Sequence, residues 1–416
     1  MTAFPNTNTR VYYATQAVAV GAIGATGIVD SWGSGPAMTL TSGVAICHGV
    51  QSVGIDTNFN LEQAFELGQL SLYENIEDIP DISVTMQKFL DGYSLLYHLG
   101  ASYDSAGTKK TNFKLTGRTD TRADVRMVIN DLDQDYVDSG NSAASELYCS
   151  GMYISSVSYT IPTDGTATED VTFVGNNKRW LNAADTGQVL LVNASASVNG
   201  AFLNVFNNDA PVYSGVGSSD GGNVLRRDDV VVSGSTAGGG GATKTYTTVL
   251  PDIIGGVGTD GTITGTVWAS TAPTNAGQLN TAASGGAHIQ SFTCSVDFGR
   301  EAINQLGSRA PYSRYATFPT EVTSTLEVIA TEGDNVTAVE TNRTNLSNHE
   351  ICIALKDSTV IHLGKKNKVS SVTYGGGDAG GGNASITYNF SNFNDFVIFH
   401  SGDPLSSEAN YWTYQF

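Results

Sequence analysis

Residues Val50–Pro80 read VQSVGIDTNFNLEQAFELGQLSLYENIEDIP, and residues Ile289–Pro319 read IQSFTCSVDFGREAINQLGSRAPYSRYATFP. The two stretches align without a gap at an offset of 239, and eight of the 31 aligned positions are identical. The identical pairs are Gln51/Gln290, Ser52/Ser291, Phe59/Phe298, Glu62/Glu301, Leu67/Leu306, Gly68/Gly307, Tyr73/Tyr312 and Pro80/Pro319. Because glycine and proline constrain the shape of the backbone, the match predicts that one local structure occurs twice.

A second pair of segments repeats in the same order. SSVSY at Ser155–Tyr159 is followed by VTF at Val171–Phe173, and SSVTY at Ser370–Tyr374 is followed by ITY at Ile386–Tyr388. Each pair alternates apolar and polar residues on both sides of a turn segment, which predicts a β-hairpin. The offset here is 215, so the first copy carries 24 extra residues, and we place this insertion in the loop-like region 104–125.

Composition favours a large β protein with many turns. The chain has 416 residues, enough for two sizeable domains, and 47 of them are glycine. Its formal charge of -19 opposes binding to the phosphates of free nucleic acid. We expect a soluble protein without a cleaved signal, because the N-terminus has no basic start followed by an apolar core and no segment has membrane-spanning length.

The pattern predicts a mainly β fold of two tandem β-sandwich or partial-barrel domains, each with a short helix, plus a glycine-rich arm. Residues 1–180 are expected to form the first domain, with a helix ending at Gly100. Residues 181–286 are expected to form the arm together with the opening strands of the second domain, which occupies 287–416. This middle region is rich in Gly, Ser, Ala, Thr and Asn.

No motif points to catalysis or to a cofactor. Asp131, Asp133 and Asp135 have the alternate spacing of a calcium loop. Tyr136 and Ser142 stand where such a loop requires Gly and Glu, so a solvated acidic turn is favoured over a metal site. The six histidines lack metal-site spacing, the four cysteines are interpreted as buried thiols, and neither a nucleophile elbow nor a phosphate loop is present. We therefore expect no enzyme and no cofactor.

The segment HGVQSVGIDTNFNLEQAFELGQLSLYENIEDIPDISVTMQKFLDGYSLLYHL, residues 48–99, resembles the tail-tube (major tail) proteins of long-tailed bacteriophages. The duplication is similar to that of tube proteins in which one chain carries two tube domains. The resemblance implies strands that line a hollow tube and loops that reach neighbouring rings. It also implies a virion tail protein, assembled in the host cytoplasm, with sheath or terminator, tape-measure and baseplate or tip proteins as partners.

The resemblance leads to three further expectations. Single-domain tube proteins form rings of six, so a chain with two domains is expected to form trimeric rings stacked head to tail. Phage DNA would pass through transiently without specific binding, along a net negative lumen, with no membrane contact. Asp164, Glu169, Asp170 and Asp378, on or beside the repeated hairpin tips, are candidates either for that lumen or for the outer surface. The glycine-rich arm and the N-terminal segment are expected to contact neighbouring rings.

Two alternatives stay open at this point. One is a tube or ring component of a related bacterial injection machine. The other is a carbohydrate-binding β-sandwich protein, which would be a monomer with an aromatic surface platform. The basic clusters Arg226–Arg227 and Lys365–Lys368 hint at contacts with acidic patches of other subunits.

Overall fold

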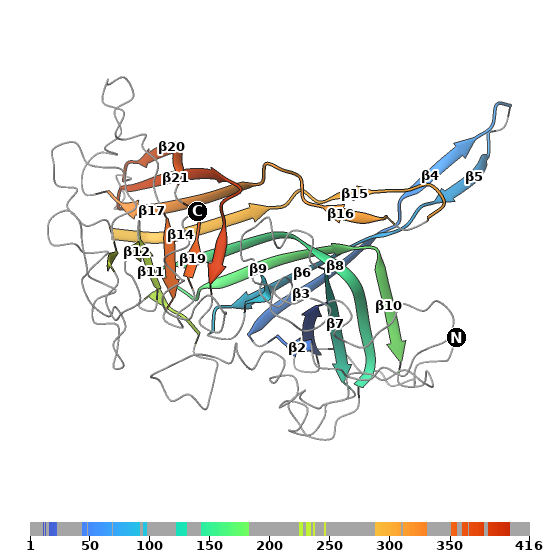
Figure 1. Cartoon of the computed structure of the whole chain (residues 1–416), viewed down its shortest axis with the longest axis horizontal. Coiled ribbons are helices and arrows are strands. Elements are labelled where there is room, and N and C mark those ends of the chain that lie inside the picture. Colours follow the sequence, from blue (N-terminus) through green and yellow to red (C-terminus); the bar gives the residue numbers. More distant parts are fainter. Residues whose placement is uncertain are drawn as a thin grey trace.

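The computed structural model describes about half of the chain, and most of this part is β-strand (Figure 1). The described residues are 11, 13, 16–22, 44–47, 49–68, 70–91, 95–97, 122–130, 143–182, 224–227, 230–233, 236–237, 245–246, 288–308, 311–330, 351–355, 360–364, 366–377 and 382–399. Figure 1 shows the sheets gathered at one side and two narrow hairpins that extend away from them. The prediction of a mainly β fold is confirmed for this part of the chain.

Ten strands come from the first half of the sequence. They are β1 (Gln16–Ala22), β2 (Val44–Ile46), β3 (Val50–Asn58), β4 (Leu61–Phe65), β5 (Leu72–Glu77), β6 (Asp81–Phe89), β7 (Arg122–Asn130), β8 (Ala143–Pro162), β9 (Thr168–Gly175) and β10 (Asn177–Asn182).

Twelve strands follow in the second half. They are β11 (Val230–Ser233), β12 (Thr236–Ala237), β13 (Thr245–Tyr246), β14 (His288–Asp297), β15 (Glu301–Ile303), β16 (Ser313–Tyr315), β17 (Glu321–Ile329), β18 (Cys352–Leu355), β19 (Val360–His362), β20 (Lys368–Gly375), β21 (Ser385–Phe393) and β22 (Val397–Phe399).

The central feature is a run of eight antiparallel strands in the order β3-β6-β9-β8-β14-β17-β21-β20. The first four strands come from the first half of the chain and the last four from the second half. Both groups share one connectivity. In the first group the β8–β9 hairpin joins β6 through β9, and in the second group the β20–β21 hairpin joins β17 through β21. The predicted hairpins are confirmed as β8–β9 and β20–β21.

A second set of pairings also has the same order in both halves. The first half contains β1-β7-β8-β10, with β2 added beside β1, and the second half contains β11-β18-β19-β22. Strand β8 has 20 residues and takes part in both sets, whereas β19 and β20 divide these roles in the second half.

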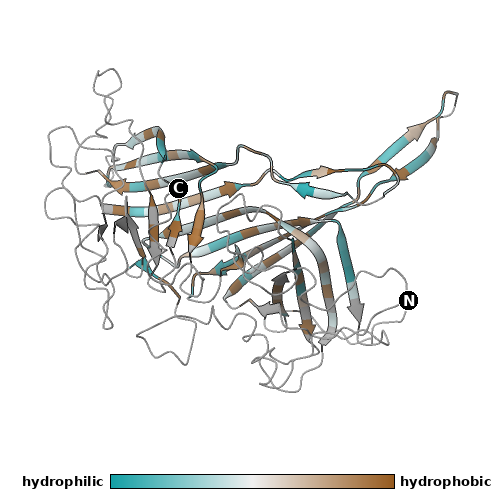
Figure 2. Cartoon of the chain, viewed as in Figure 1, coloured by the Kyte–Doolittle hydropathy of each residue, from teal (hydrophilic) through white to brown (hydrophobic). Residues whose placement is uncertain are grey.

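Period-two patterning puts the core on one face of the eight strands. Ile82, Val84 and Met86 of β6 are buried, and the residues between them are not. The same alternation holds along β9, β17 and β21, and Figure 2 shows it as alternating bands of colour. Since successive strand side chains point to opposite faces, one face packs inward and the other stays open.

The two halves agree in the fine detail of their ladders. The β3–β6 register shifts between Val50 and Ser52, and the β14–β17 register shifts between Ile289 and Ser291, at the sequence offset of 239. A shift between Ile154 and Ser156 in β8 likewise recurs between Val369 and Ser371 in β20, at the second offset of 215. Bulges are positional features of a fold, so the coincidence of both bulges ties the repeat to backbone structure.

The structure departs from the ungapped alignment at two places. Ser52 lies opposite Gln87, and Ser291 lies opposite Glu327, so β6 and β17 are related by an offset of 240, whereas β3 and β14 are related by 239. The offset changes near Pro80 and Pro319. The bond before Pro319, Phe318–Pro319, is the one cis peptide bond among the described residues. Strand β21 corresponds to β9 at an offset of 217, whereas β20 corresponds to β8 at an offset of 215. The two offsets differ because the turn of the second hairpin is longer.

Other expectations fall partly or wholly outside the described residues. Leu96 and Tyr97 are helical, but residues 92–94 and 98–100 are outside, so the helix ending at Gly100 stays a prediction. The same holds for the insertion, most of the glycine-rich arm and the first ten residues. Within the described part, no helix is long and apolar enough to cross a membrane.

Candidate assembly surfaces

Two hairpin arms leave the sheet at the same place in each half. The first, β4–β5, connects β3 to β6, and the second, β15–β16, connects β14 to β17. Ala64 pairs with Glu74 in one arm, and Ile303 pairs with Ser313 in the other, which is the same register at an offset of 239. Gly68 and Gly307 both have a positive φ in the turns, which explains why glycine occurs at both positions.

The arms carry most of the exposed apolar surface. Thirteen of the eighteen large hydrophobic side chains that are exposed in the described residues lie on the arms or their flanks: Phe59, Leu61, Phe65, Leu67, Leu70, Leu72, Tyr73, Ile76, Ile303, Leu306, Tyr312, Tyr315 and Phe318. An isolated two-stranded hairpin is marginally stable in water. Clustered exposed apolar side chains mark interaction sites, so the arms are candidate docking elements.

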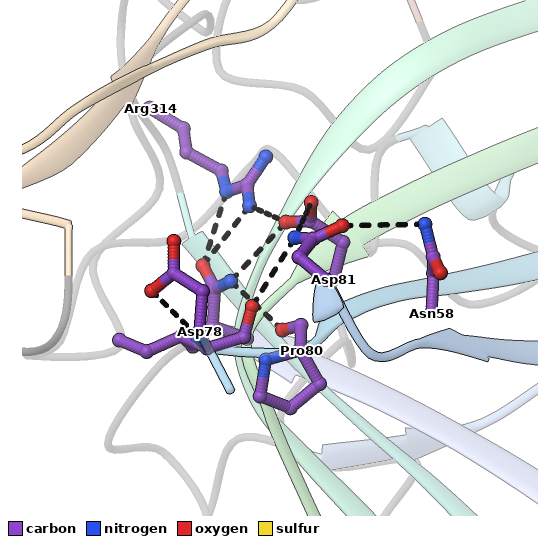
Figure 3. A network of polar contacts seen from close by, with 8 residues as sticks. Asn58, Asp78, Pro80, Asp81 and Arg314 are labelled. Atoms are coloured by element: carbon purple, nitrogen blue, oxygen red, sulfur yellow. Dashed lines mark hydrogen bonds and ion pairs between the residues drawn. The ribbon is translucent and has the colours of Figure 1, made fainter. Parts of the chain in front are cut away.

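A polar network links the two halves at the base of the arms (Figure 3). Arg314 of β16 forms an ion pair with Asp81 of β6 and donates to the Asn176 side-chain oxygen at 3.2 Å. Asn176 in turn donates to the Pro80 carbonyl at 3.0 Å, and Asn60 donates to Asp81 at 3.1 Å. The network fixes the second arm against the first half of the chain.

Partial burial alone would raise the pKa of Asp81, but the hydrogen bonds from Asn60 and Arg314 and the Arg314 charge outweigh it and lower the pKa. Because the pKa of Asp81 is lower in the folded state than in the unfolded state, the carboxylate stabilises the fold at pH values above the ordinary Asp pKa. This stabilisation is lost as the pH falls through the folded-state pKa. The contribution is modest, because half of the Asp81 side chain is exposed.

We predict that Arg314→Ala lowers the free energy of unfolding by about 0.5–1.5 kcal/mol at neutral pH. The loss should shrink in acid, where Asp81 is protonated. Arg314→Lys keeps the charge but lacks the planar guanidinium group, so its free energy of unfolding should lie between those of the unsubstituted chain and Arg314→Ala. Chemical denaturation at pH 7 and pH 3 measures this, and an equal loss at both pH values would contradict the ion-pair explanation.

The open face of the eight strands is polar and acidic. Side chains that lie opposite one another on neighbouring strands form polar rows across this face. One row contains Ser158, Ser295 and Thr323, and another contains Thr172, Ser156 and Asp297. The carboxylates on this face in the described strands are Asp56, Asp81, Asp170, Asp297, Glu321 and Glu327. Lys368, at the β20 edge, is the one cation that the ladders place with them.

The opposite, buried face contains a charged cluster. Lys88 is fully buried, forms an ion pair with Asp91 and donates to the Phe89 carbonyl at 2.9 Å. Glu169 is also fully buried; it accepts from the amides of Leu96 and Tyr97 at 2.7 and 3.1 Å, and from the Tyr159 hydroxyl at 2.8 Å. Burial raises the pKa of Glu169, although these donors oppose the shift.

This cluster is structural, and it corrects one expectation. Glu169 stands beside a repeated hairpin tip and was a candidate for a lumen carboxylate together with Asp164, Asp170 and Asp378. Its side chain instead points into the core and ties β9 to residues 96–97. Asp164 is exposed, Asp170 belongs to the open face, and Asp378 lies outside the described residues.

The seam between the halves is an extended ladder. Strand β8 pairs with β14 from Ser156 opposite Asp297 to Pro162 opposite Ser291. The ladder continues at both ends, with Phe298 donating to the Ser155 carbonyl at 2.8 Å and Thr163 donating to the Gln290 carbonyl at 2.9 Å. Strand β3 and strand β20 end the run of eight, and neither has a partner strand on its outer side among the described residues.

The repeat-matched residues divide between two environments. Glu62/Glu301, Leu67/Leu306 and Tyr73/Tyr312 belong to the arms, whereas Gln51 and Gln290 occupy the two bulges. Phe298 is buried beside the seam, but Phe59 is 62% exposed.

The calcium-like trio Asp131, Asp133 and Asp135 lies outside the described residues, and the residues that are described contain no group of three potential metal ligands. Cys47, Cys149 and Cys294 are buried thiols, and burial raises the pKa of each to about 12.

Comparison with known proteins gives a structural likeness without a sequence family. No family model matches the chain, and no curated protein matches it. Part of the chain is similar to a solved chain of the anti-feeding prophage cap, described as a tube-terminating cap, with a TM-score of 0.27, 10% identity, and coverage of 42% of this chain and 94% of that one. A chain of the anti-feeding prophage baseplate is similar over 43% of this chain and 99% of its own length, with a TM-score of 0.27 and 9% identity. Each solved chain is therefore covered almost whole by less than half of this chain.

Proposed function

We propose that this chain is a repeating structural subunit of a phage tail or of a related tail-like injection machine, and that it polymerises into stacked rings around a hollow channel. One observation carries the proposal: two halves with the same strand order meet edge to edge, and the equivalent outer edges have no partner strand among the described residues. Each half uses one sheet edge in this contact and keeps its other edge, so the same kind of contact can be repeated between chains.

The two halves act as duplicated domains in this proposal. Their strand orders, both bulges and the arm registers support the duplication. The domain limits are then 1–180 and 287–416, with the pairing of β11 to β18 adding part of 181–286 to the second domain. Two domains per chain lead to trimeric rings if six domains complete the circumference, as the resemblance to tube proteins implies.

The arms supply the contact between rings. They extend beyond the sheets and expose apolar side chains that a neighbouring subunit could cover. The expectation that the glycine-rich arm and the N-terminal segment contact neighbouring rings stays a prediction, since most of both lies outside the described residues. Sheath or terminator, tape-measure and baseplate or tip proteins would be the further partners in a virion tail.

The open face of the eight strands would line the channel. Its serine and threonine rows offer no basic groove, and its carboxylates repel phosphates at short range. DNA could pass without being held, because binding by counterion release needs a track of lysines and arginines. No catalytic step is required of this surface, and no cofactor has a part in it.

Charge reversal on the open face is expected to make assembled tubes retain DNA. In Glu321→Lys/Glu327→Lys, each ring would present cations, and retention should fall steeply with added salt. Glu321→Gln/Glu327→Gln removes charge without adding cations and serves as the matched control. Retention of labelled duplex DNA by pelleted tubes is the readout, and equal retention by both variants would refute the lining role.

The remaining alternative is a carbohydrate-binding monomer. Trp180 is half-exposed, whereas Trp32, Trp268 and Trp412 lie outside the described residues. Sedimentation and negative-stain microscopy of the purified protein distinguish the two functions. Hollow filaments support the structural role, and a dispersed monomer that binds glycans would replace it.

A further inference from the structure

The two outer edges of the eight strands, called the free edges because no strand in the described part of the chain pairs with them, are copies of the two edges that meet at the internal seam. Strand β14 corresponds to β3 at an offset of 239, and β8 corresponds to β20 at an offset of 215, each anchored by a matching bulge. The β8–β14 ladder therefore serves as a template for pairing β20 with β3. Within one chain this pairing is not made.

Side-chain exposure identifies what the free edges lack. At the seam Tyr159 is fully buried and Phe298 is 2% exposed. Their counterparts at the free edges, Tyr374 and Phe59, are 51% and 62% exposed. The same positions are thus covered where a neighbouring half is present and bare where it is absent.

In the described part of the chain, the free edges carry little of the usual protection of edge strands, although each contains one bulge. Strand β3 runs for nine residues and β20 for eight, and neither contains proline. Each carries only one charged residue, Asp56 and Lys368. A long edge with little protection is a template for another strand, so natural proteins keep one mainly where pairing is intended.

We propose that β20 of one chain pairs antiparallel with β3 of a second copy of this chain, in the register of the internal seam. Transferring the seam by the two offsets puts Asp56 opposite Thr373, Ile55 opposite Tyr374 and Asn58 opposite Ser371. The Phe59 amide then donates to the Ser370 carbonyl, as the Phe298 amide does to Ser155. The contact joins two different edges, so it propagates from chain to chain and closes into a ring.

This inference rests on the proposed function, but it specifies the contact within the ring, residue by residue. The Phe298 and Thr163 hydrogen bonds show that Ser158 and Ser295 form a non-hydrogen-bonded pair of the seam. Asp56 and Thr373 are their counterparts, so their Cα atoms should lie about 4.5 Å apart, within reach of a disulfide.

Cysteine cross-linking tests the register. Assembled Asp56→Cys/Thr373→Cys should give covalent dimers and trimers on oxidation with diamide, at about ten times the yield of Asp56→Cys/Ser371→Cys, whose residues would be diagonal. The unsubstituted chain controls for the native cysteines. Filaments with equal or reversed yields would overturn the register while leaving the proposed function standing, whereas the absence of any filament or ring from the unsubstituted chain would overturn both.

A proline at the β20 edge provides a second test. Tyr374 lies opposite Ile386, and by the alternation of the ladder its amide points to the free edge. Tyr374→Pro should therefore leave a folded monomer that forms no rings, while Tyr374→Ser still assembles. Normal rings from a folded Tyr374→Pro chain would contradict the proposed pairing.

Discussion

Leu67→Ser/Leu70→Ser is expected to fold normally and to stop assembling at the single ring. Both leucines are fully exposed at the tip of the first arm, so the isolated chain should keep its stability within about 0.5 kcal/mol. Burying a leucine contributes about 1.5–3 kcal/mol, so losing two weakens each arm contact by a factor of about 10²–10⁴. Ring formation is spared because β3 and β20 are unchanged.

The control for this variant is Asn75→Ser, which changes a polar residue of the same arm. Its filaments should match those of the unsubstituted chain. Analytical ultracentrifugation and microscopy separate single rings from filaments. Full-length filaments from Leu67→Ser/Leu70→Ser would exclude the arm tips from the contact between rings.

Asp91→Ala is expected to destabilise the fold by about 3–5 kcal/mol, because it leaves the Lys88 ammonium buried without its ion-pair partner. Denaturant unfolding of the unassembled chain measures the loss. Such an effect would reduce the yield of folded protein before any assembly step. It would identify the charged cluster as part of the core.

The double variant Lys88→Met/Asp91→Ala separates lost charge pairing from lost packing. Removing both charges should recover part of the stability, so the two substitutions should be strongly non-additive. A loss below about 1 kcal/mol for Asp91→Ala, or a double variant less stable than Asp91→Ala alone, would contradict this explanation.

Strands that pack against the core could be predicted from the sequence. Strand β6 and the β8–β9 and β20–β21 hairpins alternate apolar and polar residues, and the structure places one face of each inward. The repeated segments also predicted that Gly68 and Gly307 have special backbone geometry, and both have a positive φ. Local patterning was sufficient there because burial on one face imposes it.

Three features were missed, for physical reasons. The arms do not pack against the core, so the apolar residues of LEQAF and LYENIE are exposed, although the turn glycine between them was a usable signal. The buried position of Glu169 depends on the amides of Leu96 and Tyr97, which are distant from it in sequence. The β8–β14 seam is also non-local, and periodicity cannot indicate which edges meet.

The most direct measurement of the central claim is a cryo-electron-microscopy reconstruction of the purified, assembled protein. We expect stacked rings of three chains, with β20 of each chain paired to β3 of the next and the acidic open face toward the channel. Six chains per ring, or rings in which β3 and β20 remain apart, would contradict this account.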